Sequence, residues 1–175
     1  IAAIRDPNPV VFMFHKALQG MGWLGTEKDA IVHVPEAAYE VELGKAVITR
    51  PGTDVTIVGI TSGVHFALKA ARTLEEQGVS AEVIDLRSLA PLDRDTVIES
   101  VKKTGRLIVV DEDYHSYGMT AEIIASVVEV GVPLKAAPQR VAYPDIPIPF
   151  ARPMEQWALP SPEKIIAAFN KMKED

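Results

Sequence analysis

The stretch from residue 81 to residue 117, AEVIDLRSLAPLDRDTVIESVKKTGRLIVVDEDYHSY, constrains the fold more than any other part of the chain. Residues 81–86 are mostly apolar and β-branched, which predicts a strand buried on both faces. Asp93 is a good helix N-cap, and Gly105 follows the last residue of the amphipathic pattern that it opens. Residues 107–110 then predict a second buried strand. Two parallel strands joined by a helix imply a right-handed crossover.

The same alternation extends to both sides of this stretch. Further strands are expected at 10–14, 41–49, 55–60 and 140–143, and further helices at 62–78, 118–130 and from 162 onward. The expected fold class is therefore α/β, a doubly wound, mostly parallel sheet flanked by helices. Eight of the 13 prolines lie between residues 133 and 162, so residues 143–150 are expected to run extended over the surface.

Composition excludes several classes of function. The 175 residues carry a formal net charge of −6, which argues against nucleic-acid binding. There is no cysteine, which rules out disulfides and thiolate chemistry and is typical of a reducing compartment, so we expect a cytoplasmic protein. No apolar run is long enough to span a bilayer. The chain starts Ile-Ala-Ala-Ile without methionine, and we expect it to be part of a longer protein.

Two glycine patterns are candidate phosphate sites. Residues 20–25 match G-x-G-x-x-G, but the residues that follow do not predict the helix that this fingerprint needs, and a loop is the alternative. The turn at residues 59–63 leads from a strand into a helix, where an anion can sit on the helix N-terminus. That turn has no P-loop lysine, and an ordinary N-cap at Ser62 is the alternative.

The acids Asp111, Glu112 and Asp113 follow a buried strand, where ligands and partners meet α/β sheets. They can bind a cation or supply a general base, with a solvated loop or an interface as the alternative. No two histidines have the spacing of a zinc site. His65 is expected to pack against the core, because it lies beside the apolar stripe of its helix. His115 is the best candidate for an acid–imidazole pair, because it comes directly after these acids. No complete active site is apparent, so the residues by themselves indicate a module that binds or assembles.

Five segments together resemble the β subunit of the thiamine-diphosphate-dependent 2-oxo acid dehydrogenases. They are VVFMFHK (10–16), LGKA (43–46), DVTIVGITSGVHFALKAA (54–71), AEVIDLRSLAPLDRDTVIESVKKTGRLIVVDEDY (81–114) and YPDIPIPFARPMEQWALPSPEKI (143–165). The segment FMFHK (12–16) is most similar to the acetoin dehydrogenase branch, since pyruvate dehydrogenase relatives more often carry an acid in place of Phe14. The resemblance implies that residues 1–52 are the end of a pyrimidine-binding domain and a linker. It also implies that residues 53–175 are a transketolase-like C-terminal domain.

The resemblance places the chemistry of the family outside this chain. The cofactor-activating glutamate is expected upstream, and thiamine diphosphate and magnesium are expected mainly on the α subunit. We therefore expect no catalytic residue here, and no turnover or thiamine diphosphate binding by the chain alone. Ala3, Asp6 and Asn8 match ligand positions of a structural potassium site, mostly through carbonyl oxygens that suit a hard cation. Residues 1–8 are expected to become ordered only beside the missing chain.

The implied function is assembly within an acetoin or pyruvate dehydrogenase that feeds a lipoyl acyltransferase. The implied partners are an α subunit, a second β subunit and the acyltransferase core. The residues expected to dock them are Ile146, Ile148, Phe150, Met154 and Trp157, and the alternative is that these side chains cover the sheet of their own domain. Acids near the end of the chain, Glu155, Glu174 and Asp175, are expected to meet a basic module. The alternatives are a branched-chain 2-oxo acid dehydrogenase β subunit, or a non-catalytic assembly domain of another transketolase-like protein.

Overall fold

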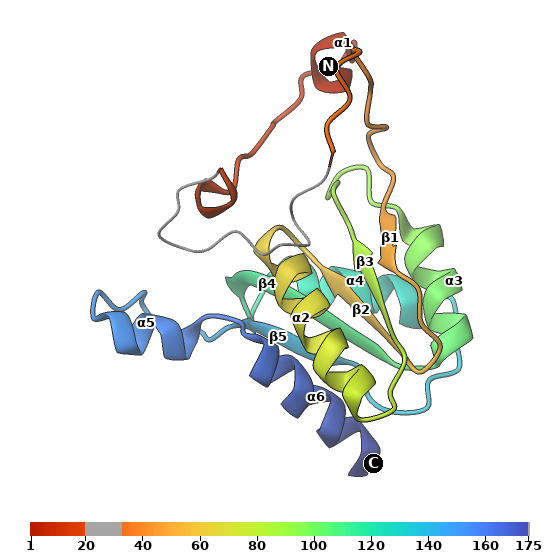
Figure 1. The fold of residues 1–175 in the computed structure, drawn as a ribbon, viewed down its shortest axis with the longest axis vertical. Helices are drawn as coiled ribbons and strands as arrows, with labels where there is room; N and C mark the ends of the chain where they lie inside the picture. Colours follow the sequence, from red (N-terminus) through yellow and green to blue (C-terminus); the bar gives the residue numbers. More distant parts are fainter. Residues whose placement is uncertain (20–32, 175) are drawn as a thin grey trace.

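The computed structural model describes residues 1–19 and 33–174. Within these residues the sheet has five strands in the order β1-β3-β2-β4-β5, and of these β1 alone runs antiparallel to its neighbour (Figure 1). The strands are β1 (Val47–Arg50), β2 (Val55–Gly59), β3 (Ala81–Asp85), β4 (Leu107–Tyr114) and β5 (Gln139–Tyr143). The helices are α1 (Ala2–Arg5), the short 3₁₀ helix η1 (Lys16–Leu18), α2 (Ser62–Glu76), α3 (Arg94–Thr104), α4 (Met119–Val128), α5 (Arg152–Ala158) and α6 (Pro162–Glu174).

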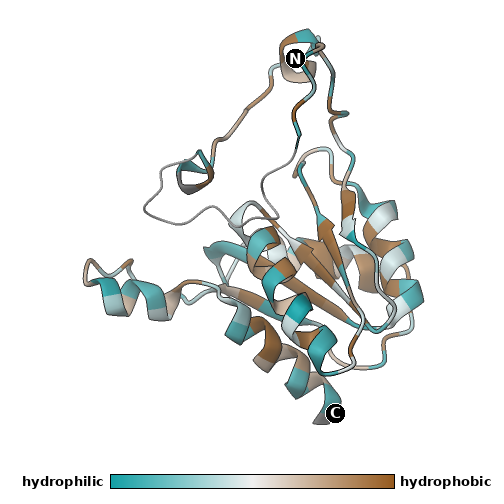
Figure 2. Ribbon diagram, viewed as in Figure 1, coloured by the Kyte–Doolittle hydropathy of each residue, from teal (hydrophilic) through white to brown (hydrophobic). Residues whose placement is uncertain are grey.

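Helices cover both faces of the sheet, so the doubly wound, mostly parallel fold is confirmed. α2 and α6 pack on one face, where Ile57, Leu74 and Ile165 are fully buried. α3 and α4 pack on the other face, around Val58 and Ile123. The central strands are coloured mostly as hydrophobic, while the helices carry both polar and apolar residues (Figure 2). Burial on both faces is why strands of this kind read as continuous apolar runs in the sequence.

Two helix ends lie where the sequence predicted them. Asp93 caps α3, because its carboxylate accepts hydrogen bonds from the backbone N–H of Thr96 at 3.2 Å and from the Thr96 hydroxyl at 2.8 Å. Its second role was not visible in the sequence: the same carboxylate accepts the backbone N–H of Ala46 at 3.0 Å. Gly105 ends α3 in the left-handed region, with φ of 75°, which an L side chain rarely adopts.

Three expectations about the strands were wrong. Residues 10–14 form no strand, and they are exposed. Of the expected strand at 41–49 only the end survives, in β1. A strand needs a neighbour to complete its backbone hydrogen bonds, and no described strand lies beside these residues. The third expectation placed the acids at 111–113 in a loop, but β4 continues to Tyr114, so these acids belong to the strand.

Two expectations about the helices were also incomplete. Ser62 does not cap α2; Thr61 is the N-cap, with φ of 49°, and Ser62 is buried inside the helix. α5 was not expected, and it projects from the sheet on the proline-rich segment after β5 (Figure 1). Residues 144–151 are extended or bent, as predicted. The final helix follows Ser161 and begins at Pro162 as expected, and it buries Ile165, Phe169 and Met172.

Candidate functional site

The carboxyl end of β4 carries the largest group of acids in the described sheet. Asp111 is buried, Glu112 is half-buried and Asp113 is exposed, because β4 leaves the core toward its carboxyl end. The three carboxylates therefore lie in different environments. Within residues 1–19 and 33–174, no group of three or more acidic or histidine side chains is placed to hold a metal ion.

Burial controls the protonation of Asp111. Desolvation raises the pKa of its carboxyl group, and the backbone N–H groups of Asp113 and Glu112 offset this only in part. The neighbouring charges of Asp113 and Glu112 raise the pKa further. A carboxyl group of this kind, at the carboxyl end of a parallel strand, is a candidate for a functional role.

An acid–imidazole pair exists at this edge, but the histidine is not the one expected. His15 lies against Glu112, with 2.6 Å between Nε2 and Oε2. His115 instead uses its backbone: its N–H donates to the Tyr143 carbonyl at 2.7 Å, and its carbonyl accepts from Arg140 at 2.8 Å. No local pattern indicated the His15 contact, because the two partners are 97 residues apart.

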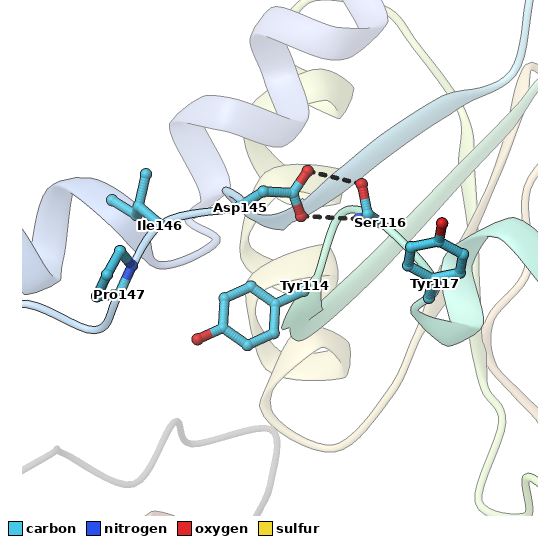
Figure 3. Close-up of a pocket in the computed structure, with 6 residues that line it drawn as sticks. All are labelled: Tyr114, Ser116, Tyr117, Asp145, Ile146 and Pro147. Carbon is cyan, nitrogen blue, oxygen red and sulfur yellow. Dashed lines mark hydrogen bonds between the residues drawn. The ribbon is translucent and has the colours of Figure 1, made fainter.

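A shallow pocket of about 530 Å³ lies beside this edge, between the loop after β4 and the segment after β5 (Figure 3). Asp145 and Ser116 are joined across it, since the carboxylate accepts the Ser116 N–H at 3.0 Å and its hydroxyl at 2.7 Å. These bonds lower the pKa of Asp145. Tyr114, Tyr117 and Ile146 also line the pocket (Figure 3). Tyr117 is fully exposed, so the pocket opens onto an aromatic surface.

The two glycine patterns have different outcomes. The G-x-G-x-x-G pattern at residues 20–25 lies outside the described residues. In the turn at residues 59–63, a Cβ on Gly63 would lie 2.6 Å from the Val110 carbonyl oxygen, and a Cβ on Gly59 would lie 2.5 Å from the Val64 nitrogen. These glycines let α2 approach the sheet closely. Packing therefore explains the pattern without a phosphate.

The proposed ion ligands Ala3, Asp6 and Asn8 lie in and after α1. Asp6 Oδ1 accepts hydrogen bonds from the Asn8 backbone N–H at 2.8 Å and from its side-chain amide at 3.0 Å. The Ala3 carbonyl would meet the N–H of residue 7 in a continued helix, but Pro7 has none. Oxygen atoms of Ala3 and Asp6 are thus left for another partner.

Exposed apolar side chains gather on two segments outside the sheet. The exposed apolar residues of the first segment, before the sheet, include Ile4, Val11, Phe12, Met13 and Phe14. Those of the second, after β5, are Ile148, Phe150, Met154 and Trp157. Four of the five residues expected to dock partners are therefore exposed, and Ile146 is half-exposed. Trp157 is 65% exposed, so it does not cover the sheet of its own domain.

Similarity to known proteins covers nearly the whole chain. The chain is 47% identical over 168 residues to the pyruvate dehydrogenase E1 component subunit beta-1, mitochondrial, of Arabidopsis thaliana. The aligned region covers 95% of this chain and 45% of that protein. The chain is 44% identical to the acetoin:2,6-dichlorophenolindophenol oxidoreductase subunit beta of Cupriavidus necator, over 98% of this chain and 48% of that protein. The pyruvate dehydrogenase E1 component subunit beta of Bacillus subtilis is 42% identical, over 99% of this chain and 51% of that protein. The chain thus spans about half the length of these curated relatives.

A solved structure supports the fold. The "split gene transketolase, inactive beta4 tetramer" superposes with a TM-score of 0.67 at 29% sequence identity, covering 81% of this chain and 45% of that one. None of the described helices is long and apolar enough to cross a membrane. Residues 44–165 match the model of the transketolase C-terminal domain, which is most of the described sheet and its helices. The chain therefore belongs to the transketolase C-terminal domain family.

Proposed function

We propose that this chain is part of the β subunit of a thiamine-diphosphate-dependent dehydrogenase that acts on pyruvate or acetoin and feeds a lipoyl acyltransferase. The relatives named above, at 42–47% identity, support this proposal. Their identities are too close to one another to favour one substrate. In this proposal, residues 1–52 end a pyrimidine-binding domain and act as a linker, and residues 53–175 form the C-terminal domain.

The task of the described part is subunit assembly. The observation that carries this is the pair of exposed apolar segments, around Phe12 before the sheet and around Phe150 after it. Large exposed apolar patches mark protein interfaces, since removing apolar surface from water gains a free energy of about 25 cal/mol per Å². The proposed partners are an α subunit, a second β subunit and the acyltransferase core. The proline-rich course of residues 144–150 limits the entropy that this segment loses on binding.

The described residues do not provide a diphosphate site, so we assign thiamine diphosphate and magnesium to the rest of the complex. A diphosphate needs positive charge or several converging N–H donors. The turn that begins α2 brings no lysine or arginine in residues 59–63, and its glycines serve packing. We assign no catalytic residue to this chain, and we expect no turnover from it alone.

A structural potassium ion fits the first residues. The carbonyl oxygen of Ala3 has no i+4 donor because residue 7 is proline, and the Asp6 carboxylate has an oxygen beyond the one that Asn8 uses. Hard cations prefer such oxygen ligands. Ala3, Asp6 and Asn8 would supply part of the shell. Thermal unfolding of the full-length protein in potassium, compared with a tetramethylammonium salt, tests this: Asp6→Ala should remove the potassium-dependent stabilisation.

The decisive experiment uses the full-length gene product with its α subunit. The reconstituted complex is assayed with acetoin, pyruvate and a branched-chain 2-oxo acid. We expect turnover of acetoin or pyruvate that depends on thiamine diphosphate, and activity on none of the three would refute the proposal. Localisation of the tagged gene product decides between the cytoplasm, which we propose, and the mitochondrion, which the names of the plant relatives indicate for those proteins.

The assembly role is tested separately. Full-length protein carrying Phe150→Ala, Trp157→Ala or a deletion after Phe169 is used to pull down the α subunit and the acyltransferase. We expect at least one partner to be lost. If all three variants bind both partners as well as the unchanged protein, the surface after β5 is not the docking face. The second candidate, an assembly domain of another transketolase-like protein, is favoured by the similarity to the split-gene transketolase, and it predicts no acyltransferase binding.

A further inference from the structure

The open edge of the sheet has a groove beside it. β5 is the last strand in the order and pairs with β4, so on its other side it has no partner among the described strands. A groove of about 430 Å³ lies there, between residues 140–142 of β5 and α6. Ala167 and Ala168 contribute small side chains to its α6 side, and Trp157 forms an apolar wall. The groove is thus lined by a strand edge that can accept a further strand.

Positive charge surrounds this groove, although the chain as a whole has a net charge of −6. Arg140, Lys164 and Lys171 are among its lining residues, and none of the lining residues in the described part of the chain is acidic. Lys171 is exposed on α6. Asp145 interacts electrostatically with Arg140, but it is bound to Ser116 and lines the other pocket. The groove therefore favours an anionic partner.

Two of the three cations are held in place by neutral groups. The Lys164 ammonium donates to the carbonyls of Ala158 at 3.1 Å and Leu159 at 2.7 Å, at the end of α5, and also to the Trp157 carbonyl. Arg140 donates to the His115 carbonyl at 2.8 Å. Carbonyl oxygens fix these side chains without cancelling their charge. The site is thus preorganised, which lowers the entropy lost when a partner binds.

A second copy of the chain does not suit this edge. If two β5 edges paired, the cations of both copies would face one another, and like charges across an interface are unfavourable. An extended acidic segment avoids this conflict. Its backbone can add to the strand edge, as peptides do in β-augmentation, while its side chains meet the lysines of α6.

We propose that the groove between β5 and α6 binds an extended acidic segment of a partner protein, which adds as a strand to the outer edge of β5. Its carboxylates face Lys164 and Lys171, and an apolar side chain packs on Trp157. This inference goes beyond the proposed function, because it depends on neither the substrate nor the cofactor.

The test uses the full-length β subunit in its purified complex with the α subunit. The probe is a fluorescein-labelled peptide of alternating valine and glutamate, and binding is followed by fluorescence anisotropy. One control peptide carries lysine in place of glutamate, and a second has proline at alternate positions to block strand pairing. We expect saturable binding of the first peptide alone, weaker at high salt, with slower amide exchange in residues 139–143.

Matched variants locate the site. Lys171→Glu should weaken binding at least about tenfold, because an attraction becomes a repulsion in the groove. Lys102→Glu, on the exposed face of α3, should leave the affinity unchanged, and circular dichroism checks that both variants fold. Trp157→Ala should also weaken binding. The proposal is overturned if the first peptide does not bind, if either control peptide binds equally well, or if Lys171→Glu has no effect. Crosslinks between Lys171 residues of two copies would assign the edge to self-pairing and would equally overturn it.

Discussion

His15 and Glu112 are 97 residues apart in the sequence, and their side chains meet with 2.6 Å between Nε2 and Oε2. Both side chains are largely shielded, with 22% and 26% exposed. His15 directly precedes η1 on the segment before the sheet, and Glu112 lies in β4. The contact therefore ties the first segment of the chain to the carboxyl end of the central sheet. His15 Nδ1 is buried without a hydrogen-bond partner among the described residues, so the contact with the sheet is made through Nε2.

We expect Glu112→Gln to loosen the segment before the sheet without unfolding the domain. A hydrogen bond to a charged group contributes about 1.5–3 kcal/mol, and the amide keeps the shape but not the charge. Amide exchange measured by mass spectrometry should become faster in residues 10–19 and stay unchanged in β2. Asp113→Asn, an exposed neighbour, is the control. Unchanged exchange in residues 10–19 would show that the contact does not hold the segment.

A buried hydroxyl cluster should contribute to stability. Thr56 Oγ1 lies 2.6 Å from Ser100 Oγ and 2.8 Å from Thr104 Oγ1, and all three residues are buried. Thr56→Val keeps the shape but removes two buried hydrogen bonds, which at about 0.5–1.5 kcal/mol each costs about 1–3 kcal/mol. Urea unfolding measures this loss. Adding Ser100→Ala should cost less in the Thr56→Val background than in the unchanged protein, whereas additive losses would contradict the coupling.

Glu82 should make the stability of the fold vary with pH in the acid range. Burial by itself would raise the pKa of Glu82, but hydrogen bonds from Lys103, Ser100 and the Gly52 N–H lower it below its ordinary value. A lowered folded-state pKa gives stability that is present above the ordinary pKa and is lost as pH falls through the folded-state pKa. Glu82→Gln should therefore destabilise the protein near neutral pH, and by less in acid. Urea unfolding across pH tests this.

The exposed Glu99 provides the control for Glu82. Glu99 pairs with Lys102 on the surface of α3, where such pairs contribute little. Glu99→Gln should leave the pH profile of the unchanged protein intact. A Glu82→Gln profile that runs parallel to that of the unchanged protein over the whole acid range would show that Glu82 is not the group responsible.

The contribution of Asp111 to stability should change with pH in the direction opposite to that of Glu82. Burial raises its pKa in the folded state, so stability from this group is full below the ordinary pKa and is lost as pH rises through the folded-state pKa. Asp111→Asn removes the cost of a buried charge, and its amide oxygen can still accept the N–H groups of Asp113 and Glu112. We expect a higher melting temperature near neutral pH and no gain in strong acid. Destabilisation at neutral pH would indicate that the ionised carboxylate has a partner of its own.

Local signals in the sequence were sufficient for most of the elements. α3 begins after Asp93 and ends before Gly105 as predicted, because a cap and a left-handed glycine act within a few residues of the chain. The strands β2 and β3 were expected in one sheet, and they pair in parallel. The local signal failed at the start of α2: Ser62 is buried inside the helix, and Thr61 occupies the N-cap position without a side-chain capping hydrogen bond.

The sequence by itself determined the alternation of buried strands and amphipathic helices, since hydrophobic periodicity is a property of neighbouring residues. Only the tertiary structure decided which strands are neighbours, that β1 runs antiparallel, and that residues 10–14 have no strand to pair with. It also decided that Glu112 meets His15 and not His115, and that Trp157 faces a groove instead of the core. Each of these depends on contacts between residues far apart in the chain. No local pattern encodes such contacts, because they exist only once the sheet has formed.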